Sequence, residues 1–222
     1  APETSNEQSL VRYSGQYDVV FKGNKVATDV RSEAYLKRDM SPLTGIVYAV
    51  YEDGSLKYEA FYNNGLIQGD AKRWSEDGDL LVRTQHDKGN LTSRKEYYYS
   101  TPDQLKSHEV FEDNNLKENT LWHRNGELQG KTTFLNGQRE GVHTFYFDSG
   151  FKASEQEFSR GKLHGRDVAW YENGQMMYLH YYNDGDKADG VHTFWYENGQ
   201  KEQEQITESN RTVRTRRWRE ED

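Results

Sequence analysis

The sequence predicts an all-β protein, an elongated, twisted antiparallel meander of about seven two-stranded repeats in one sheet. Three observations favour this fold. Glycines recur at a period of about 24 residues, Asn-Gly and Asp-Gly pairs mark the turns, and no window has the capped 3.6-residue periodicity of a helix. Only 33% of the 222 residues are hydrophobic while 14% are aromatic, which argues against both a thick two-layer core and a disordered chain.

Three glycine series share this period, and together they define the repeats. The first is Gly54, Gly78, Gly126, Gly150, Gly174 and Gly199, the second is Gly65, Gly89, Gly137, Gly161 and Gly185, and the third is Gly45, Gly69, Gly141, Gly165 and Gly190. A gap of two periods in the first series contains a degenerate copy at 102–105. We therefore place the repeats at residues 43–210.

One repeat illustrates the expected elements. Residues 166–172 and 175–182 read as strands because they are rich in aromatic and branched side chains. Asn173-Gly174 between them predicts a type I′ turn, in which both central residues have positive φ, and residues 183–185 turn the chain again. The copy at 90–115 has no turn glycine at 102–104 and has Asn114-Asn115 in place of Asn-Gly, which predicts a local bulge or loop in a preserved fold.

The flanking segments differ from the repeats. Residues 1–9 are small, polar and acidic, and read as a flexible arm. Within 10–42 we expect N-terminal strands that cap the repeats, with a hairpin of 16–21 and 25–30 around Lys22-Gly23-Asn24 and a further strand at 34–37. Residues 211–222 form a charged C-terminal strand or tail.

Two segments carry a family resemblance. Trp170-Tyr171-Glu172-Asn173-Gly174-Gln175 and Trp195-Tyr196-Glu197-Asn198-Gly199-Gln200 resemble the bacterial MORN-variant repeat family, and Tyr35-Leu36-Lys37 followed by Ser41-Pro42-Leu43-Thr44-Gly45 is similar to its first repeat. The resemblance covers about 180 residues and implies MORN-like repeats in one sheet. Since many members are YwqK-like antitoxin or immunity proteins, and many look exported or lipid-anchored, it also implies a binding role.

Alternation along each strand assigns side chains to two faces. One face, called the core face below, needs cover from sheet curvature or from a partner. It is predicted to collect Tyr51, Phe145, Phe147, Tyr171, Phe194, Tyr196, Leu56, Leu80, Leu128, Met176, Tyr62, Phe134, Phe158 and Tyr182. The opposite face, called the ladder face, is predicted to carry an aromatic ladder of Trp74, Trp122, Tyr146, Trp170 and Trp195 among charged neighbours.

The ladder is the candidate partner-binding site, because Trp and Tyr anchors in a polar setting are typical of interface hot spots. The predicted contact residues are Trp122, Tyr146, Trp170 and Trp195 with Glu155, Glu202 and Glu204. The alternative is that the ladder only shields the backbone and packs on neighbouring aliphatic stems.

Other chemistry finds little support in the sequence. The chain has no Cys, its seven His residues form no metal-ligand motif, and its recurring turn carboxylates are explained by turn chemistry, so we expect no catalytic residue, metal or cofactor. The net charge of −8 argues against nucleic-acid binding. One basic cluster stands out: Arg211, Arg214, Arg216, Arg217 and Arg219. It reads either as a solvated edge strand whose charge blocks pairing or as a site for an anion or acidic partner.

These observations predict a non-enzymatic binding protein, specifically an immunity or antitoxin protein that neutralises a partner toxin by stoichiometric binding. The alternative is an exported surface scaffold or a lipid- or glycan-binding repeat protein. The partner is expected to be a protein and not a nucleic acid, membrane association is weakly supported, and the oligomeric state stays open. The start at Ala1 without Met favours export to the periplasm or cell surface over a cytoplasmic location.

Overall fold

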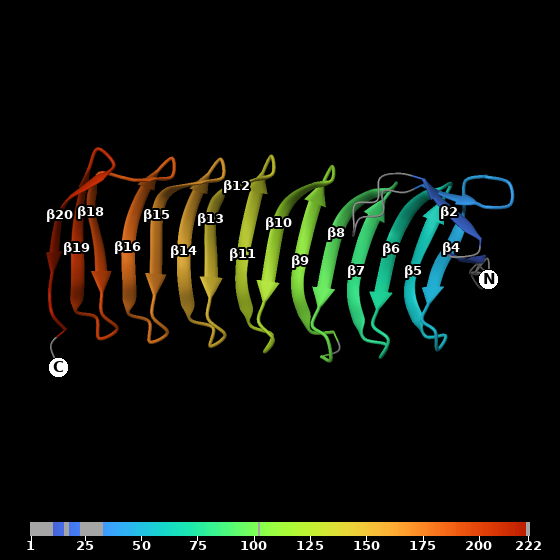
Figure 1. Ribbon diagram of the computed structural model, residues 1–222, viewed down its shortest axis with the longest axis horizontal. Helices are drawn as coiled ribbons and strands as arrows, with labels where there is room; N and C mark the ends of the chain where they lie inside the picture. Colours follow the sequence, from blue (N-terminus) through green and yellow to red (C-terminus); the bar gives the residue numbers. More distant parts are fainter. Residues whose placement is uncertain (1–10, 16–17, 23–32, 102, 221–222) are drawn as a thin grey trace, which may run out of the picture. The chain divides into compact units, whose positions relative to one another are not determined.

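A computed structural model describes residues 11–15, 18–22, 33–101 and 103–220, and every helix or strand assigned among them is a β-strand (Figure 1). The chain divides into two compact units. Unit 1 holds the residues up to Leu105 together with Phe111–Asn114, and unit 2 holds Lys106–Val110 and the residues from Asn115 onward. The expected all-β antiparallel meander is confirmed in each.

Unit 1 begins with three short strands and continues as a meander. The strands are β1 (Arg12–Ser14), β2 (Val19–Lys22), β3 (Glu33–Leu36), β4 (Gly45–Val50), β5 (Leu56–Asn63), β6 (Leu66–Trp74), β7 (Leu80–Asp87) and β8 (Asn90–Tyr97). Each of β4 to β7 pairs antiparallel with the next strand, whereas β1 pairs in parallel with β4 and β2 pairs antiparallel with β3. Strand β9 (Leu105–Glu112) contributes residues to both units.

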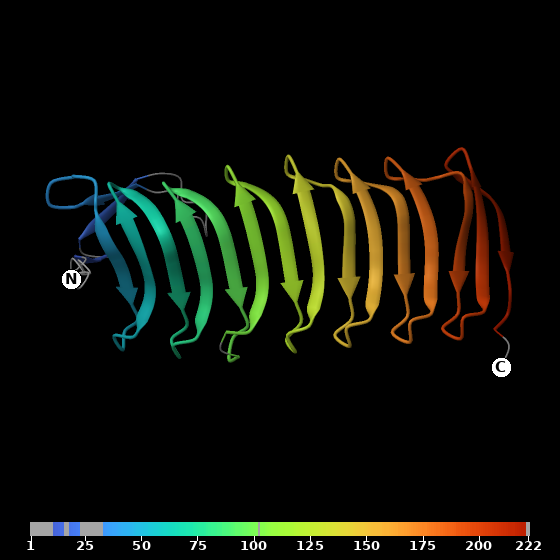
Figure 2. The same ribbon diagram turned by 180° about the vertical axis from the view of Figure 1, so that it is seen from behind.

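Unit 2 is an antiparallel meander in a single layer, as the view from behind also shows (Figure 2). Its strands are β10 (Asn115–Trp122), β11 (Leu128–Leu135), β12 (Gln138–Arg139), β13 (Gly141–Tyr146), β14 (Lys152–Ser159), β15 (Lys162–Trp170), β16 (Met176–Asn183), β17 (Asp186–Lys187), β18 (Gly190–Trp195), β19 (Lys201–Glu208) and β20 (Arg211–Arg217). The short β12 and β17 pair antiparallel with the ends of β11 and β16, which also pair directly with β13 and β18.

The two turns of each repeat have different conformations. Asp184 (φ 51) and Gly185 (φ 97) both have positive φ, as a type I′ turn requires. At Asn173-Gly174 only the glycine does (φ 86), so the predicted type I′ turn there is wrong. The Tyr171 N–H donates to the Gln175 carbonyl (2.8 Å) and the Gly174 N–H to the Tyr171 carbonyl (2.9 Å), as in a three-residue loop that ends on a left-handed glycine.

That loop introduces a bulge, which corrects part of the face assignment. Trp170 pairs with Met176 while Ala169 pairs with Tyr178, so Met177 is an extra residue. Four side chains predicted on the core face lie on the ladder face instead, because each pairs with a residue at the ladder position. They are Leu56, Leu80, Leu128 and Met176, opposite Val50, Trp74, Trp122 and Trp170.

The less regular segments agree with the sequence in part. Strand β3 matches the expected strand at 34–37, and β2 overlaps the one at 16–21, but its partner is β3. The expected strand at 25–30 and the arm at 1–9 lie outside the described residues. In the degenerate copy, β8 ends at Tyr97 and β9 begins only at Leu105, so the connection is longer, and positive φ falls on Asp113 and Asn114, one residue earlier than predicted.

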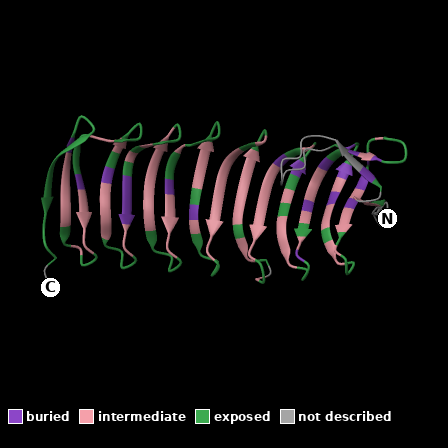
Figure 3. Cartoon of the chain, in the orientation of Figure 1, coloured by how far each residue is buried: buried purple, intermediate pink, exposed green. Residues whose placement is uncertain are grey.

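The apolar core lies in unit 1, where the N-terminal segments cover the core face of β4 to β6 (Figure 3). It consists of Val19, Ala34, Leu36, Leu43, Val47, Ala60, Tyr62, Ile67 and Ala71. Gly45 allows the close approach of β1, because a Cβ there would lie 2.6 Å from the Val11 carbonyl oxygen and 2.8 Å from the Tyr13 ring. The Ala34 N–H donates to the Gly65 carbonyl (2.8 Å), which fixes β3 to the β5–β6 turn.

Candidate functional site

The strand register places the predicted ladder of unit 2 on one face. Paired residues on neighbouring strands share a face, and one continuous row of pairs crosses the unit: Lys131, Thr144, Glu155, Val168, Leu179, Thr193 and Glu204. The ladder side chains lie two residues along from this row on their own strands and are half-buried: Trp122, Tyr146, Trp170 and Trp195. Glu155 and Glu204 belong to the same face, and Glu202 is the extra residue of the bulge opposite Trp195.

The predicted carboxylates are engaged within the chain. Lys152 Nζ lies 2.9 Å from Glu155 Oε2 and 5.4 Å from the centre of the Trp170 ring, so it joins the carboxylate to the indole. Arg166 Nη2 lies 3.9 Å from the other Glu155 oxygen. The side chain of Glu155 is therefore only 19% exposed.

The same arrangement recurs at the C-terminal end of unit 2. Lys201 Nζ lies 2.6 Å from Glu204 Oε1 and 6.0 Å from the Trp218 ring. The sequence reasoning missed both lysines and Trp218. The signal that identifies them is a Lys two residues after a turn glycine, a Glu three residues further on, and an aromatic ladder position on the next strand.

An exposed apolar patch lies on the ladder face, on the other side of the paired row from the ladder. Its exposed members are Tyr181 and Val191 (42% and 49%), which lie two residues beyond Leu179 and Thr193, whereas Val168, which pairs with Leu179, is fully buried. These side chains and the ladder indoles share one face of β15, β16 and β18. The patch was not predicted from the sequence. The signal was available, because side chains two residues apart on a strand lie on the same face, as 179 and 181 do and as 191 and 193 do.

Hydrogen bonds between successive repeats hold the ladder backbone in place. The residue that follows a ladder position bonds to the carbonyl of the next ladder position: Tyr171 Oη donates to Trp195 O (2.9 Å) and Tyr196 Oη to Trp218 O (3.0 Å). The turn asparagines act similarly. Asn173 Oδ1 accepts from the Gln175 N–H (2.9 Å), while its Nδ2 donates to the Glu197 carbonyl (2.8 Å).

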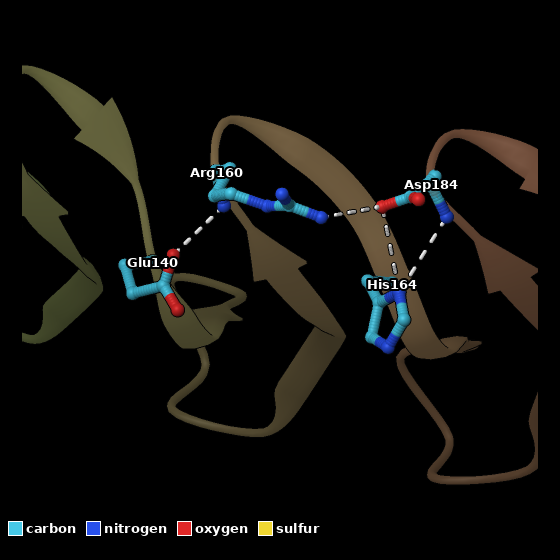
Figure 4. Close-up of polar contacts among 4 residues, drawn as sticks. All are labelled: Glu140, Arg160, His164 and Asp184. Atoms are coloured by element: carbon cyan, nitrogen blue, oxygen red, sulfur yellow. Dashed lines mark hydrogen bonds and ion pairs between the residues drawn. The ribbon is translucent and has the colours of Figure 1, made fainter.

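The opposite turn edge has its own repeating contact (Figure 4). The side chain just before a glycine of the third series accepts the N–H of the first type I′ turn residue in the next repeat. Glu140 Oε2 accepts from the Arg160 N–H (2.8 Å), and His164 Nδ1 from the Asp184 N–H (3.5 Å). Arg160 Nη2 also lies 3.4 Å from Asp184 Oδ1. His164 therefore has a structural partner, as its equivalents Thr44 and Gln68 do in unit 1.

The core face of unit 2 carries buried polar groups. Asp167 Oδ1 accepts from Gln156 Nε2 (3.0 Å) and from Tyr178 Oη (3.4 Å), and burial with this carboxylate raises the pKa of Tyr178 to about 12. His180 stacks on Tyr178 with ring centres 4.6 Å apart. Its burial, with Lys187 and His192 nearby, lowers the pKa of His180 to about 4, so its imidazole is neutral at physiological pH.

Two other histidines of this face replace backbone pairing. His143 and His192 occupy the same repeat position and are each 1% exposed. His192 Nδ1 accepts from the Tyr181 N–H (3.4 Å) and its Nε2 lies 2.9 Å from the Ala188 carbonyl oxygen, while His143 Nε2 lies 3.3 Å from the Glu140 carbonyl oxygen. No group of three or more metal-ligating side chains gathers among the residues that the structure describes.

Comparison with known proteins identifies the repeats. The MORN repeat variant family matches residues 43–64, 163–184 and 188–207, so the chain contains MORN repeat variants at these three places. Each matched segment covers a hairpin, formed by β4 and β5, by β15 and β16, or by β18 and most of β19.

Other comparisons add little. The solved structure titled "Crystal Structure of TcdB2-TccC3" aligns with 80% of this chain at 10% identity and a TM-score of 0.16, a similarity too low to carry an argument. This chain spans 15% of the length of that chain. No curated protein matches the sequence. The described residues contain no helix with the length and hydropathy needed to span a bilayer.

Proposed function

We propose that this chain is a non-enzymatic binding protein, an immunity or antitoxin protein of the YwqK-like kind that the MORN-variant resemblance implies, and that it neutralises a toxin or effector by occupying it. We further propose a location in the periplasm or at the cell surface, because many members of the family that the repeats resemble look exported. The observation that supports the proposal best is the ladder face of unit 2, which carries half-buried Trp170 and Trp195 and, four residues further along the strands, exposed Tyr181 and Val191.

The composition of this face suits a protein interface. Interface hot spots are enriched in Trp, Tyr and Arg, and are surrounded by groups that exclude water. Here the surrounding charges are already paired within the chain, as Lys152–Glu155 and Lys201–Glu204. A partner that covers this face would therefore bury fewer unpaired charges than it would if the same side chains were unpaired.

The hydrogen bonds between successive repeats also suit a binding surface. Because the Tyr171 and Asn173 hydrogen bonds already order the ladder backbone, less conformational entropy is lost when a partner binds. A standard interface needs about 800 Å² on each partner, and several strands of one face offer surface on that scale. The net charge of −8 would also speed association with a basic partner.

The proposal is tested with the proteins encoded beside this chain in its genome. We expect one of them to bind with a stoichiometry near one to one and to lose its toxic activity unmodified. A Trp170→Ala/Trp195→Ala variant should bind at least about 30-fold more weakly, since hot-spot aromatics contribute about 2 kcal/mol or more. Trp74→Ala, at the same repeat position in unit 1, is the matched control and should bind normally.

Three results would count against the proposal. Full affinity in the folded double variant would remove the ladder face from the interface. Protection at sub-stoichiometric amounts, or a chemically modified toxin, would indicate an enzyme. Binding to vesicles or glycans without any protein partner would support the scaffold, lipid or glycan alternative.

A further inference from the structure

The outer edge of β20 is an exposed sheet edge. All seven residues of Arg211–Arg217 are exposed, and within the described part of the chain β20 pairs with β19 alone. The Trp218 N–H donates to the Glu202 carbonyl (2.9 Å), so the backbone polar groups of Trp218 point towards β19. In an antiparallel strand the backbone N–H and C=O groups of alternate residues point to opposite neighbours. The backbone groups of Arg214 and Arg216 therefore also point towards β19, and those of Thr215 and Arg217 point outward.

Three arginines of this edge have no carboxylate partner within the described part of the chain. No ion pair is found for Arg214, Arg216 or Arg217 among the residues that the structure describes. Glu204 is paired in register with Arg216, yet its carboxylate contacts Lys201 at 2.6 Å. Arg217 Nε instead donates to Gln203 Oε1 (2.9 Å). A cluster of guanidinium groups without carboxylate partners in this part of the chain therefore lies on a protein that is negatively charged as a whole.

Exposed strand edges often carry features that prevent aggregation, and β20 has two of them, a bulge and a row of like charges. Val213 is a bulge residue, and like charges would oppose each other if two copies of this edge paired. Neither feature blocks an acidic strand. Beyond the bulge, residues 214–217 are regular and contain no proline, so their outward N–H and C=O groups are available for pairing. The edge therefore disfavours its own copy and favours a strand of opposite charge.

We propose that this edge binds an extended acidic segment of another protein, which adds to the sheet as a strand beyond β20. Its backbone would pair with the outward groups of Thr215 and Arg217, as in other cases of strand addition. Carboxylates at alternate positions would meet Arg214 and Arg216, which share the ladder face, and Trp218 would flank the end of the strand. This site is independent of the function proposed above.

The test uses a fluorescein-labelled peptide of about eight residues that alternates Glu and Thr, the length of an ordinary strand. We expect saturable binding by fluorescence anisotropy that weakens as salt rises. Arg214→Glu/Arg216→Glu should weaken it at least about tenfold. Thr215→Pro should weaken it too, because proline removes an outward N–H that β19 does not use. The matched control is Arg211→Glu, which reverses a charge before the bulge and should have a smaller effect.

Further measurements separate strand addition from ionic adsorption, from lipid or RNA binding and from self-association. A peptide N-methylated at alternate residues keeps its charge but loses backbone donors, so equal binding of this peptide would overturn the proposal in favour of ionic adsorption. Binding of phosphatidylserine vesicles or RNA without the peptide would also overturn it, as would a dimer of the free chain that Thr215→Pro abolishes. The Trp170→Ala/Trp195→Ala variant should bind the peptide normally, which keeps this test separate from that of the proposed function.

Discussion

The core faces of the two units have the same backbone geometry and opposite chemistry. In unit 1 the repeat position two residues after a third-series glycine is Val47 or Ala71, and both pack in the apolar core. In unit 2 the same position is His143, Asp167 or His192, all buried. Small apolar side chains occur where the N-terminal segments cover the sheet, and hydrogen-bonding side chains occur where one layer must satisfy its own polar groups.

A neighbouring position shows the same contrast. Ala60 of unit 1 corresponds to Gln156, His180 and Gln205 in unit 2. Ala60 lies under the N-terminal cover, whereas Gln156 bonds to Asp167 and His180 stacks on Tyr178. A single-layer sheet can thus be stabilised by adding a partial second layer, or by larger side chains that cover their own face through stacking and hydrogen bonds.

The comparison predicts that core truncation has its largest effect in unit 1. Ile67→Ala should lower the free energy of unfolding by about 2–5 kcal/mol, because this side chain is 2% exposed and its loss leaves a cavity. Leu163→Ala, at the equivalent position in unit 2, removes a half-buried side chain and should cost less. Urea unfolding followed by circular dichroism measures both, and equal losses would show that the N-terminal cover adds little.

A glycine pair tests the cover more directly. Gly45→Ala should cost about 1–3 kcal/mol more than Gly190→Ala, since overpacking against β1 adds to the backbone strain. A Cβ at Gly45 would lie 2.6 Å from the Val11 carbonyl oxygen, while nothing lies within 4 Å of a Cβ at Gly190. Both glycines have positive φ, so backbone strain is common to the two variants and cancels approximately in the difference. If the two unfolding midpoints shift alike, β1 does not hold its position against β4 in solution.

Acidification should weaken unit 2 through His180. The folded-state pKa of His180 is about 4, below its ordinary value near 6.5, so the unfolded chain binds the proton more readily. Stability from this group is therefore present above about pH 6.5 and is lost as pH falls towards 4. Between pH 7 and 5.5 the loss should be about 1 kcal/mol.

The control for this pH effect is His180→Gln, because glutamine already occupies the equivalent positions 156 and 205. Tryptophan fluorescence follows unit 2 well, since Trp122, Trp170, Trp195 and Trp218 all belong to it. The pH-dependence should shrink in the variant. An unchanged slope would assign the effect to other groups, such as His143, whose pKa burial also lowers.

The smallest expected change in stability comes from removing one hydrogen bond between successive repeats. Tyr171→Phe removes the hydroxyl that donates to Trp195 O and should cost about 1 kcal/mol or less. Phe147 already occupies the equivalent position one repeat earlier, so the ring itself fits. Thermal unfolding of this variant against Tyr181→Phe, whose hydroxyl lies on the exposed patch, isolates the bond. No difference between them would show that the hydroxyl bond contributes nothing.

The period and the all-β class were predictable because turn glycines leave a clear mark in the sequence. Turn type at Asn173-Gly174 was not, since an Asn-Gly pair fits both a type I′ turn and a three-residue loop, and the choice depends on bonds that Asn173 makes to Gln175 and to the next repeat. The resulting bulge moved Met176 to the ladder face.

The candidate site was predictable to a similar extent. Trp170 and Trp195 were placed on one face by alternation alone, and the register agrees. Lys152 and Lys201, which join Trp170 and Trp218 to a glutamate, were missed because each contacts a ring at the end of the next strand. The binding role of these residues stays a prediction.

The hydrogen bonds between successive repeats have a consequence for how such a chain changes over time. Tyr171 bonds to Trp195, 24 residues ahead, and Glu140 bonds to Arg160, 20 residues ahead. These hydrogen bonds therefore join one repeat to the next repeat along the chain. An in-frame duplication or deletion of one whole period would recreate the same junctions, as in other solenoid-like arrays. Each such event would add or remove one aromatic ladder position, so the length of the ladder face would change in discrete steps.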